Sequence, residues 1–589
     1  MQNLRWVFQL FIILPAGLLF SQSLAQTDTP PACSALDRTA LLSFKASIFK
    51  DTTGILSSWV GTDCCGAWDG VECNPETGRV TSLQLQRPER DNALYMKGTL
   101  SASLGNLQFL EALVISSMKE IRGTIPESFS KLAHLNQLYL ENNMLEGSIP
   151  SSLGELPSLK ALSLSGNRLQ GQLPPSLGHL TTLLQMNVGK NLLTGAIPPT
   201  FRNLHTLQSL DLSHNLLSGS IPDFVGQFQS LTLLDLSNNQ FSGQMPISLC
   251  NLYNVMDMSL EHNNLTGAIP SQIGNLKSLS SLSLSHNFLT GHIPESIVRL
   301  RNLWHFNVSR NGLSDPLPAA LAKGTHSILS IDLSYNNLHL GTVPDWVRNT
   351  GLTAVHLAGC NLKGSLPIFT KPDSLSSIDL SDNSLTGGIG HFLTNMTGLQ
   401  KLKLSNNMLR FDVSDIVLPD GLSSLDLHSN QLYGSLSRLL QNNTSSFLEV
   451  LDLSSNRITG GFPEFSAEIG LKWLDLSRNQ ITGEIPGSIS NLNALVRLDL
   501  SRNQIKGIIP SSLGQLRGLA WLDLSINVLS GKIPDSFIGL GGIKHASFRA
   551  NMLCGQIPQV RPFNIFPPVA YAHNKCLCGK PLPPCKGRN

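Results

Sequence analysis

The chain has 589 residues, of which 41% are hydrophobic and only 14% are charged, and its formal net charge at pH 7 is +2. So small a charge excludes the basic surface of a nucleic-acid-binding protein and gives no attraction to an anionic membrane surface. This length would suggest several domains, but an internal repeat predicts one elongated unit instead.

The first segment is typical of a secretory signal. Arg5 precedes an apolar run from Trp6 to Phe20, and residues 23–25 (SLA) offer small side chains for cleavage. We therefore predict a signal peptide over residues 1–25 and a secreted, extracellular chain. An uncleaved anchor is the alternative, but the run is shorter than the roughly 20 residues that a membrane span requires. No other stretch is apolar enough to cross a bilayer, so the mature chain is expected to have no membrane span.

Residues 26–79 are expected to form an N-terminal cap. Apolar residues recur at helical spacing from Ala40 to Ile48, which predicts a helix over residues 37–49 with Asp37 as its N-cap. The helix leads into WVGTDCCGAWDGVEC (residues 59–73). Such a segment closes the open hydrophobic end of a repeat protein.

One pattern then repeats through residues 80–553. Asparagine recurs every 24 residues from Asn143 to Asn311, in runs such as LQSLDLSHNLLSGSIP (residues 207–222). Two looser repeats precede it, around Leu85 and Ile115. The pattern continues at Asn336, Cys360, Asn383, Asn407, Asn430, Asn456, Asn479, Asn503, Asn527 and Asn551.

This repeat predicts its own structure. In LxLxx the leucines alternate with polar residues, so each repeat should form a short strand with leucines inside. One repeat cannot bury its leucines alone, whereas stacked repeats can. We therefore predict an α/β solenoid of about 18–20 repeats, with one parallel β-sheet on its concave face. Each buried asparagine should bond backbone groups of adjacent repeats, and the small thiol of Cys360 fits the same position.

The middle of the chain departs from the repeat. The repeat after Asn383 has Gly388-Ile389-Gly390 in place of Gly-x-Ile-Pro, and the next two lack the motif's proline. We expect a local distortion or bend between Asn311 and Asn479.

Ten cysteines in a secreted chain predict disulfides. Cys250 and Cys360 fall inside repeats and are expected to be buried thiols. A zinc site at Cys576, Cys578 and Cys585 fits the spacing, but the secretory context disfavours it. The eight cysteines near the ends are Cys33, Cys64, Cys65, Cys73, Cys554, Cys576, Cys578 and Cys585.

No motif for catalysis, phosphate binding or a cofactor is present. A column of aspartates lies four residues before the repeated asparagine, at a spacing like that of retaining glycosidases. However, the consensus LDLS generates this column, and a catalytic pair needs two unlike environments. We predict no enzyme activity, no cofactor and no metal. The column comprises Asp426, Asp452, Asp475, Asp499 and Asp523.

Residues that depart from the consensus are better candidates for binding. Trp473, Arg497 and Trp521 occupy the same position in successive repeats, so the guanidinium should lie between two indoles. Arg478 and Arg502 lie nearby in the sequence. Exposed tryptophan and arginine dominate binding hot spots, although they could instead cover leucines and neutralise aspartates. The predicted protein-binding set is Trp473, Asp475, Arg478, Arg497, Asp499, Arg502, Trp521 and Asp523.

A second aromatic cluster contains Trp304, His305, Arg310, Tyr335 and His356, with a solvated surface as the favoured interpretation. A glycosylation motif at Asn307 falls within it and would obstruct the concave face if used. The predicted glycosylation positions are Asn264, Asn307, Asn395, Asn442 and Asn443, of which the last two overlap.

The consensus LxxLxLxxNxLxGxIP resembles the plant type of leucine-rich repeat, and W…CC…WxGVxC resembles the N-terminal cap of plant extracellular members. Residues 570–585 (AYAHNKCLCGKPLPPC) resemble the C-terminal cap of polygalacturonase-inhibiting proteins, which places a C-terminal cap at residues 554–589. The repeat number instead resembles receptor-like protein ectodomains. The resemblance implies the disulfides Cys33–Cys64, Cys65–Cys73, Cys554–Cys576 and Cys578–Cys585.

These resemblances predict a secreted plant cell-wall recognition protein that binds a protein or peptide on its concave face. One hypothesis is a defence protein that inhibits a microbial polygalacturonase. The other is a receptor-like module that signals with a membrane-bound partner such as a receptor kinase. A scaffold without a ligand is the third.

Overall fold

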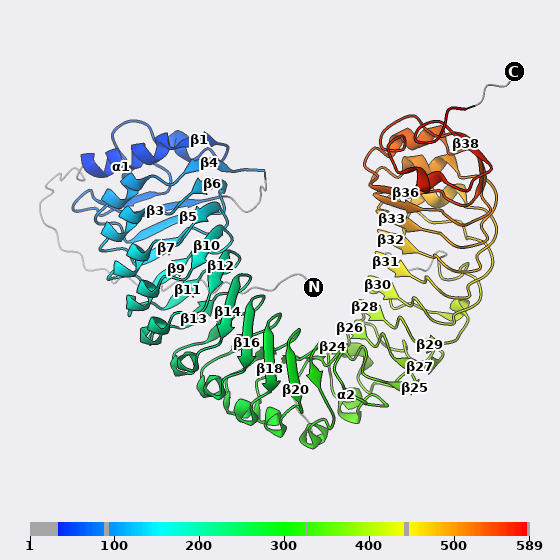
Figure 1. The fold of residues 1–589 in the computed structure, drawn as a ribbon, viewed down its shortest axis with the longest axis horizontal. Helices are drawn as coiled ribbons and strands as arrows, with labels where there is room; N and C mark the ends of the chain where they lie inside the picture. Colours follow the sequence, from blue (N-terminus) through cyan, green and yellow to red (C-terminus); the bar gives the residue numbers. More distant parts are fainter. Residues whose placement is uncertain (1–32, 88–92, 324–326, 441–446, 586–589) are drawn as a thin grey trace, which may run out of the picture.

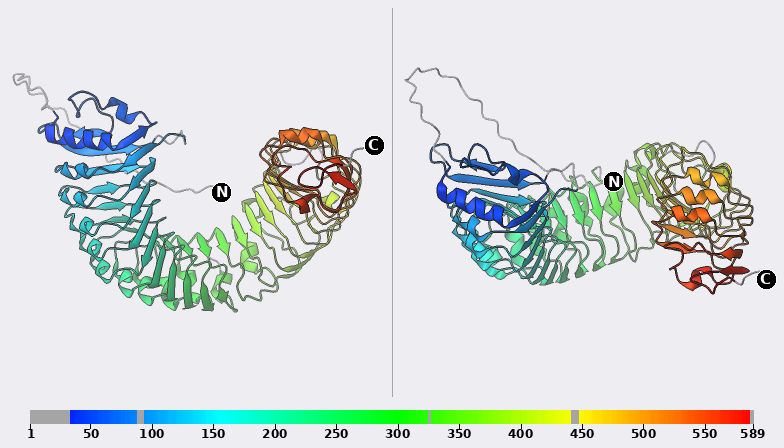
Figure 2. Two further views of the ribbon diagram at one scale, coloured as in Figure 1. Left: turned by 45° about the horizontal axis from the view of Figure 1, so that its top comes forward. Right: turned by 90° about the horizontal axis from the view of Figure 1, so that it is seen from above.

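The computed structural model describes residues 33–87, 93–323, 327–440 and 447–585. The predicted signal peptide and the glycosylation positions Asn442 and Asn443 lie outside these ranges. The described chain winds into an open, strongly curved solenoid with its two ends on opposite arms (Figure 1). Figure 2 shows that the arms do not lie in one plane, so the solenoid is also twisted.

The concave face is one continuous parallel sheet that begins at β3, and the antiparallel strand β2 (Val71–Cys73) covers its first edge. The middle residue of each strand lies in register with its neighbours, as in Leu474↔Leu498↔Leu522, and points inward. The predicted leucine-rich solenoid is thus confirmed. Its strands are β3 (Val80–Gln86), β5 (Ala112–Ser116), β7 (Gln137–Tyr139), β9 (Ala161–Ser163), β11 (Gln185–Asn187), β13 (Ser209–Asp211), β15 (Leu233–Asp235), β17 (Asp257–Ser259), β19 (Ser281–Ser283), β21 (His305–Asn307), β23 (Ser330–Asp332), β24 (Ala354–His356), β26 (Ser377–Asp379), β28 (Lys401–Lys403), β30 (Ser424–Asp426), β31 (Val450–Asp452), β32 (Trp473–Asp475), β33 (Arg497–Asp499), β34 (Trp521–Asp523) and β36 (His545–Ser547).

A second sheet runs beside the first, because the chain after many of the repeated asparagines forms another short strand. It is divided into three parts. The first contains β1 (Ile48–Asp51), β4 (Met96–Thr99), β6 (Lys119–Gly123), β8 (Met144–Gly147), β10 (Arg168–Gln172), β12 (Leu192–Gly195), β14 (Leu216–Ser220), β16 (Gln240–Gln244), β18 (Asn264–Ala268), β20 (Phe288–Gly291) and β22 (Gly312–Leu313). The others contain β25 (Lys363–Ser365), β27 (Ser384–Gly387) and β29 (Met408–Leu409), and β35 (Ser530–Gly531), β37 (Met552–Gln556) and β38 (Cys576–Cys578).

The predicted distortion therefore falls on the second sheet. Between β29 and β35 this layer retains only isolated bridges, such as Ser435↔Thr459. The concave sheet passes through the same region without a break. The concave face thus stays regular where the rest of the repeat varies.

The convex side consists mostly of single 3₁₀ turns, such as η4 (Ser151–Glu155) and η15 (Ser511–Gln515), each preceded by the proline of the repeat. In the described part of the chain, α-helix is confined to α1 (Ala35–Ala46) and α2 (Asp345–Asn349). Because these turns are thinner than helices, they bring the outer faces of neighbouring repeats close together.

The repeated asparagine stabilises the stack as predicted. The Asn215 amide donates to the carbonyls of Leu212 (3.1 Å) and of Val188 in the preceding repeat (3.0 Å), and its oxygen accepts the N–H of Leu193. At the substituted position, the Cys360 thiol donates to the Leu333 carbonyl at 3.5 Å. Each repeat therefore satisfies backbone groups of the one before it.

The N-terminal helix differs from its prediction in two respects. It ends at Ala46, because Ile48 belongs to β1, which pairs with β4. The N-cap is Ser34 and not Asp37. Asp37 is buried instead, and its carboxylate accepts hydrogen bonds from the Arg79 guanidinium at 2.8 Å and from the Val80 N–H at 3.0 Å. The helix is thereby fixed to the first repeat strand by a paired charge.

Disulfides hold both ends of the described chain. They join Cys33–Cys64, Cys65–Cys73, Cys554–Cys576 and Cys578–Cys585, the pairs that the resemblance implies. Cys250 and Cys360 are free and buried.

Candidate functional site

The predicted aromatic stack forms near the C-terminal end of the concave sheet, on strands that Figure 1 places on the inner side of one arm. Trp473, Arg497 and Trp521 are the first residues of β32, β33 and β34 and lie in direct register. The guanidinium carbon of Arg497 is 4.6 Å from the Trp473 ring centre and 4.4 Å from that of Trp521. The arginine is therefore held between two indole faces, where a cation is favoured.

His545 extends the stack by one repeat, which the sequence reasoning missed. Its ring lies 3.7 Å from that of Trp521, at an interplanar angle of 17°, and its position on β36 is in register with Trp521. Following the same repeat position from Asn527 to Asn551 would have revealed it. The site is thus a row of four side chains on four adjacent strands.

The aspartate column lies beside this row and is partly recessed. Arg497 contacts the carboxylates of Asp475 at 3.9 Å and Asp499 at 3.8 Å, and these side chains are only 10% and 11% exposed. Burial, followed by repulsion from Asp499, raises the pKa of Asp475 to about 6. Burial also raises the pKa of Asp499. The negative charge of the column is therefore poorly solvated, and Arg497 supplies part of its compensation.

Each aspartate of the column also has a structural role. The carboxylates of Asp475, Asp499 and Asp523 accept the backbone N–H two residues further on, at 2.8–3.1 Å. Asp452 makes the same bond. This contact lies at the end of each strand and is a structural reason for the aspartate in the consensus.

The structure separates Arg478 and Arg502 from the stack. Both follow their strand by three residues, in a left-handed turn with φ near 55°, and both are exposed. Within the described part of the chain, Asp475 and Asp499 form ion pairs with Arg497 and not with Arg478 or Arg502. These two arginines therefore border the concave face on the other side of the aspartates.

The stack leaves several nitrogen atoms unsatisfied. Arg497 Nε, Trp521 Nε1 and His545 Nε2 are buried without a hydrogen-bond partner among the described residues, although His545 Nε2 faces the Asp523 carboxylate at 4.0 Å. An unpaired buried polar group costs about 1–3 kcal/mol. A row that served only to cover leucines would not need these nitrogens, so stability alone does not explain the choice of residues.

An open groove of about 460 Å³ runs along the stack. Its walls are apolar where Val496 and the 40%-exposed ring of Trp473 face solvent. Lys472 and Lys544 stand at its two ends, each directly before the first strand residue of its repeat. The lining residues are Val450, Lys472, Trp473, Val496, Arg497, Ala520, Trp521 and Lys544.

The second predicted cluster divides into two groups. Trp304 is 48% exposed and lies 5.5 Å from the His305 ring. Arg310 stacks on Tyr335 at 4.1 Å, and the Tyr335 hydroxyl donates to Asp382 at 2.6 Å. The structure therefore does not form a single site from these residues.

His356, from the same predicted cluster, instead bonds Ser377 at 2.9 Å. The sequon residue Asn307 is half-buried, and its side-chain oxygen accepts from both the N–H and the hydroxyl of Ser309. By contrast, Asn264 and Asn395 are exposed and lie off the concave strands.

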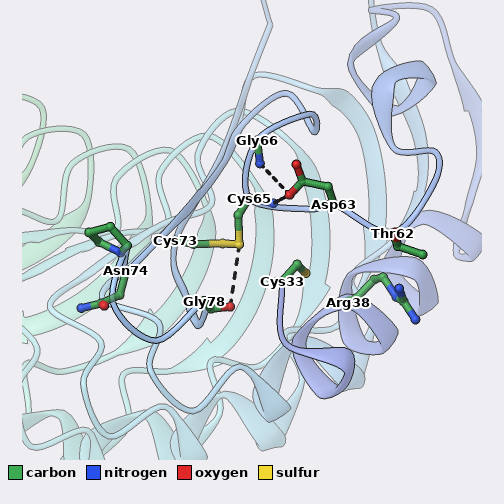
Figure 3. Close-up of a pocket in the computed structure, with 10 residues that line it drawn as sticks. Cys33, Arg38, Thr62, Asp63, Cys65, Gly66, Cys73, Asn74 and Gly78 are labelled. Atoms are coloured by element: carbon green, nitrogen blue, oxygen red, sulfur yellow. Dashed lines mark hydrogen bonds between the residues drawn. A yellow bond between two sulfur atoms is a disulfide. The ribbon is translucent and has the colours of Figure 1, made fainter. Parts of the chain in front are cut away.

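A hollow of about 540 Å³ lies in the N-terminal cap (Figure 3). One of its polar groups is engaged within the cap, since Asp63 accepts the N–H groups of Cys65 and Gly66 at 3.1 and 3.0 Å. The neighbouring disulfide joins Cys65 to Cys73. This hollow follows from the folding of the cap and is not our candidate site.

Family models match much of the chain. The leucine-rich-repeat N-terminal domain matches residues 34–74, and leucine-rich-repeat models match residues 109–169, 178–241, 253–313, 374–396, 446–505 and 495–551. The chain is 38% identical over 122 residues to the DNA damage-repair/toleration protein DRT100 of Arabidopsis thaliana and 36% over 109 residues to a polygalacturonase inhibitor of Vitis vinifera. The chain belongs to the plant leucine-rich-repeat proteins. These matches cover 19% and 18% of this chain, and only 32% and 30% of the two relatives.

Solved plant leucine-rich-repeat ectodomains superpose on nearly the whole chain. The Arabidopsis receptor kinase HAESA, in complex with the peptide hormone IDA and the co-receptor SERK1, has a TM-score of 0.58 at 30% identity. The match covers 92% of this chain and 98% of that one. The PEPR1–AtPEP1 complex gives a TM-score of 0.62 at 28% identity, covering 89% and 79%. Within the described residues, no helix of this leucine-rich-repeat protein has the length and apolarity of a membrane span.

Proposed function

We propose that this protein is a non-enzymatic, extracellular plant recognition protein that binds a peptide or protein on its concave face. Its hot spot is the row Trp473, Arg497, Trp521 and His545. The row carries the proposal because it places tryptophan and arginine, the residues that dominate binding energies, on an open groove.

The alternative, that the row is only a structural cover, accounts less well for its composition. Arg497 does compensate the aspartates, but its contacts with them are long, at 3.8–3.9 Å. The indole N–H of Trp521 gains no bond. Leucine-rich repeats elsewhere in this chain place serine or alanine at the same position, as at Ser209 and Ala354, and the sheet continues through them.

Two roles are compatible with this site. The length of the chain and its superposition on HAESA, which was solved with a peptide hormone, favour a receptor-like ligand-binding module acting with a membrane-bound partner. The match to the grape polygalacturonase inhibitor supports a defence protein that blocks a microbial wall-degrading enzyme. Secretion, glycosylation at Asn264 or Asn395, and a place in the cell wall belong to both proposals.

One experiment separates these roles. Purified wild-type protein is tested for inhibition of a panel of fungal polygalacturonases and, in parallel, for binding of labelled synthetic peptides. Arg497→Glu is compared with Arg517→Glu, which reverses the same charge in a neighbouring repeat at an exposed position outside the concave strands. We expect Arg497→Glu to weaken the interaction that is found by roughly tenfold or more, as is typical of hot spots, and Arg517→Glu to leave it unchanged.

Enzyme inhibition that depends on Arg497 would assign the defence role. Peptide binding that depends on Arg497 would assign the receptor-like role. An interaction equally insensitive to both substitutions would place the binding site elsewhere and refute the proposed hot spot.

A further inference from the structure

Most of the exposed charges around the C-terminal groove are positive, and the exposed anion Glu449 is paired with Lys472. Five exposed cationic side chains lie next to strands β32, β33 and β36. Lys472 and Lys544 stand directly before a strand, and the turns after the strands carry Arg478, Arg502 and Arg549. The aspartates of the column in the same region, Asp475, Asp499 and Asp523, are recessed into the sheet and accept backbone N–H groups. A ligand approaching the groove therefore meets cations first, which favours anionic partners.

The two lysines at the ends of the groove are available to such a ligand. Lys472 contacts Glu449 at 2.6 Å, but this pair is about half exposed and is therefore weak. No ion pair of Lys544 is found in the described part of the chain. Between the lysines, Val496 and Ala520 line the groove at the same repeat position.

The spacing of this arrangement is that of a peptide. Lys472 and Lys544 occupy equivalent positions in repeats three strands apart, which separates their backbones by about 14 Å. An extended chain advances about 3.3 Å per residue, so about four residues span that distance. One apolar side chain between two anionic ones would thus meet the apolar wall while its neighbours reached the lysines.

An acidic polysaccharide fits the groove less well. Sugars bind tryptophan by lying on a face of the indole, but Arg497 covers one face of both Trp473 and Trp521. His545 covers the other face of Trp521. Trp521 therefore presents only its edge to the groove, and Val450, Val496 and Ala520 offer aliphatic contacts that a polyuronate cannot use.

We infer that the groove of the proposed binding site takes an extended acidic peptide, with an apolar side chain flanked by two carboxylates about four residues apart. This inference rests on the proposed function, since it specifies the chemistry of the ligand at the same site. The peptide would lie across the strands, along the axis of the solenoid.

The inference is tested with fluorescein-labelled peptides of ten residues and the full mature protein. One set carries two glutamates four positions apart with a leucine or phenylalanine between them, the second has lysines in place of the glutamates, and the third has adjacent glutamates. We expect the first set to bind best, and Lys544→Glu to weaken it roughly tenfold while improving the lysine set. Arg517→Glu is the charge-matched control, and added salt should weaken the binding.

Three results would overturn the inference. Equal binding of the acidic and basic sets would remove the charge preference, and if Trp521→Ala weakened both sets, the proposed function would still stand. Binding of none of the three peptide sets would count against the proposed peptide site as well. Binding of oligogalacturonate that Lys544→Glu weakens, without peptide binding, would assign the groove to a polysaccharide.

Discussion

Arg497 connects two features that the sequence presents separately, the aromatic row and the aspartate column. Its stem and guanidinium lie between two indoles, and its charge faces Asp475 and Asp499. The same residue therefore helps to stabilise a poorly solvated carboxylate pair and to shape the groove. A residue that packs between two rings and also compensates buried charge is restricted in what can replace it, and Arg497→Lys would lose the planar contact with both rings.

Asp475→Asn tests the electrostatic cost of the column. The pKa of Asp475 is raised to about 6, so the folded chain keeps a proton that the unfolded chain has lost above about pH 4. Wild type therefore loses stability from this group as the pH rises from about 4 to 6, by up to about 3 kcal/mol. Asparagine can still accept the Ser477 N–H, as Asn187 accepts that of Gly189.

We expect Asp475→Asn to match wild type near pH 4 and to be about 1–3 kcal/mol more stable above pH 6. Urea unfolding at several pH values measures the difference, with Asp211→Asn, which removes the aspartate at the equivalent position of β13, as the control for loss of one charge. An advantage that is the same at every pH would contradict the assigned cause.

Sequence reasoning located most of the candidate site because each position of the repeat has a fixed place in the structure. Trp473, Arg497 and Trp521 share one repeat position, so their contact followed from strand spacing alone. Arg478 and Arg502 occupy a different repeat position, in the left-handed turn after the strand, and their nearness in sequence did not bring them into the row. The burial of a single side-chain atom, unlike its repeat position, depends on side-chain conformation. The nitrogens without hydrogen-bond partners therefore could not be predicted from the sequence.

At the scale of the element, the repeated asparagine is the main link between successive repeats. In Asn239 the amide donates to the carbonyls of Leu212, Leu236 and Ser237, and its oxygen accepts the N–H of Leu217. These bonds replace the ladder that the chain loses where it leaves the strand.

Asn239→Ala should leave several buried backbone groups without partners and destabilise the surrounding repeats by about 2–4 kcal/mol. Gln240→Ala removes an exposed amide from the next residue and should change stability by no more than about 0.5 kcal/mol. Thermal unfolding of the two variants compares them directly. Similar effects of both substitutions would show that the asparagine is not the link.

The second sheet was less predictable than the first. Its strands stop after β29, where the repeats lose their Gly-x-Ile-Pro motif. However, residues 483–486 (GEIP) and 507–510 (GIIP) contain the intact motif and still form no strand. A strand needs a paired neighbour as well as a suitable sequence. The sheet starts again only where successive repeats both form the strand, as at β25 and β27 or at β35 and β37, and this dependence on neighbours is not visible within a single repeat.

At the scale of the whole molecule, each repeat contacts mainly its neighbours, so stability is transmitted along the chain from repeat to repeat. The caps then decide how readily the ends open. At the C-terminal end, Phe548, Phe563 and Tyr571 are buried together, and the Tyr571 hydroxyl donates to the Phe563 carbonyl. The disulfide Cys554–Cys576 joins β37 to β38 beside this cluster.

Removing that disulfide should therefore affect the groove before it affects the rest of the solenoid. In a Cys554→Ser, Cys576→Ser variant, we expect faster hydrogen exchange in β36 and β37 and a progressively smaller effect toward β31, corresponding to about 2–4 kcal/mol at the end. Because His545 lies on β36, ligand binding should weaken as well. The variant Cys33→Ser, Cys64→Ser is the matched control, since it should loosen α1 and β3 and leave the groove intact. Faster exchange along the entire chain in either variant would mean that the solenoid unfolds as one cooperative unit, and the position of the site next to the C-terminal cap would then carry no consequence for its stability.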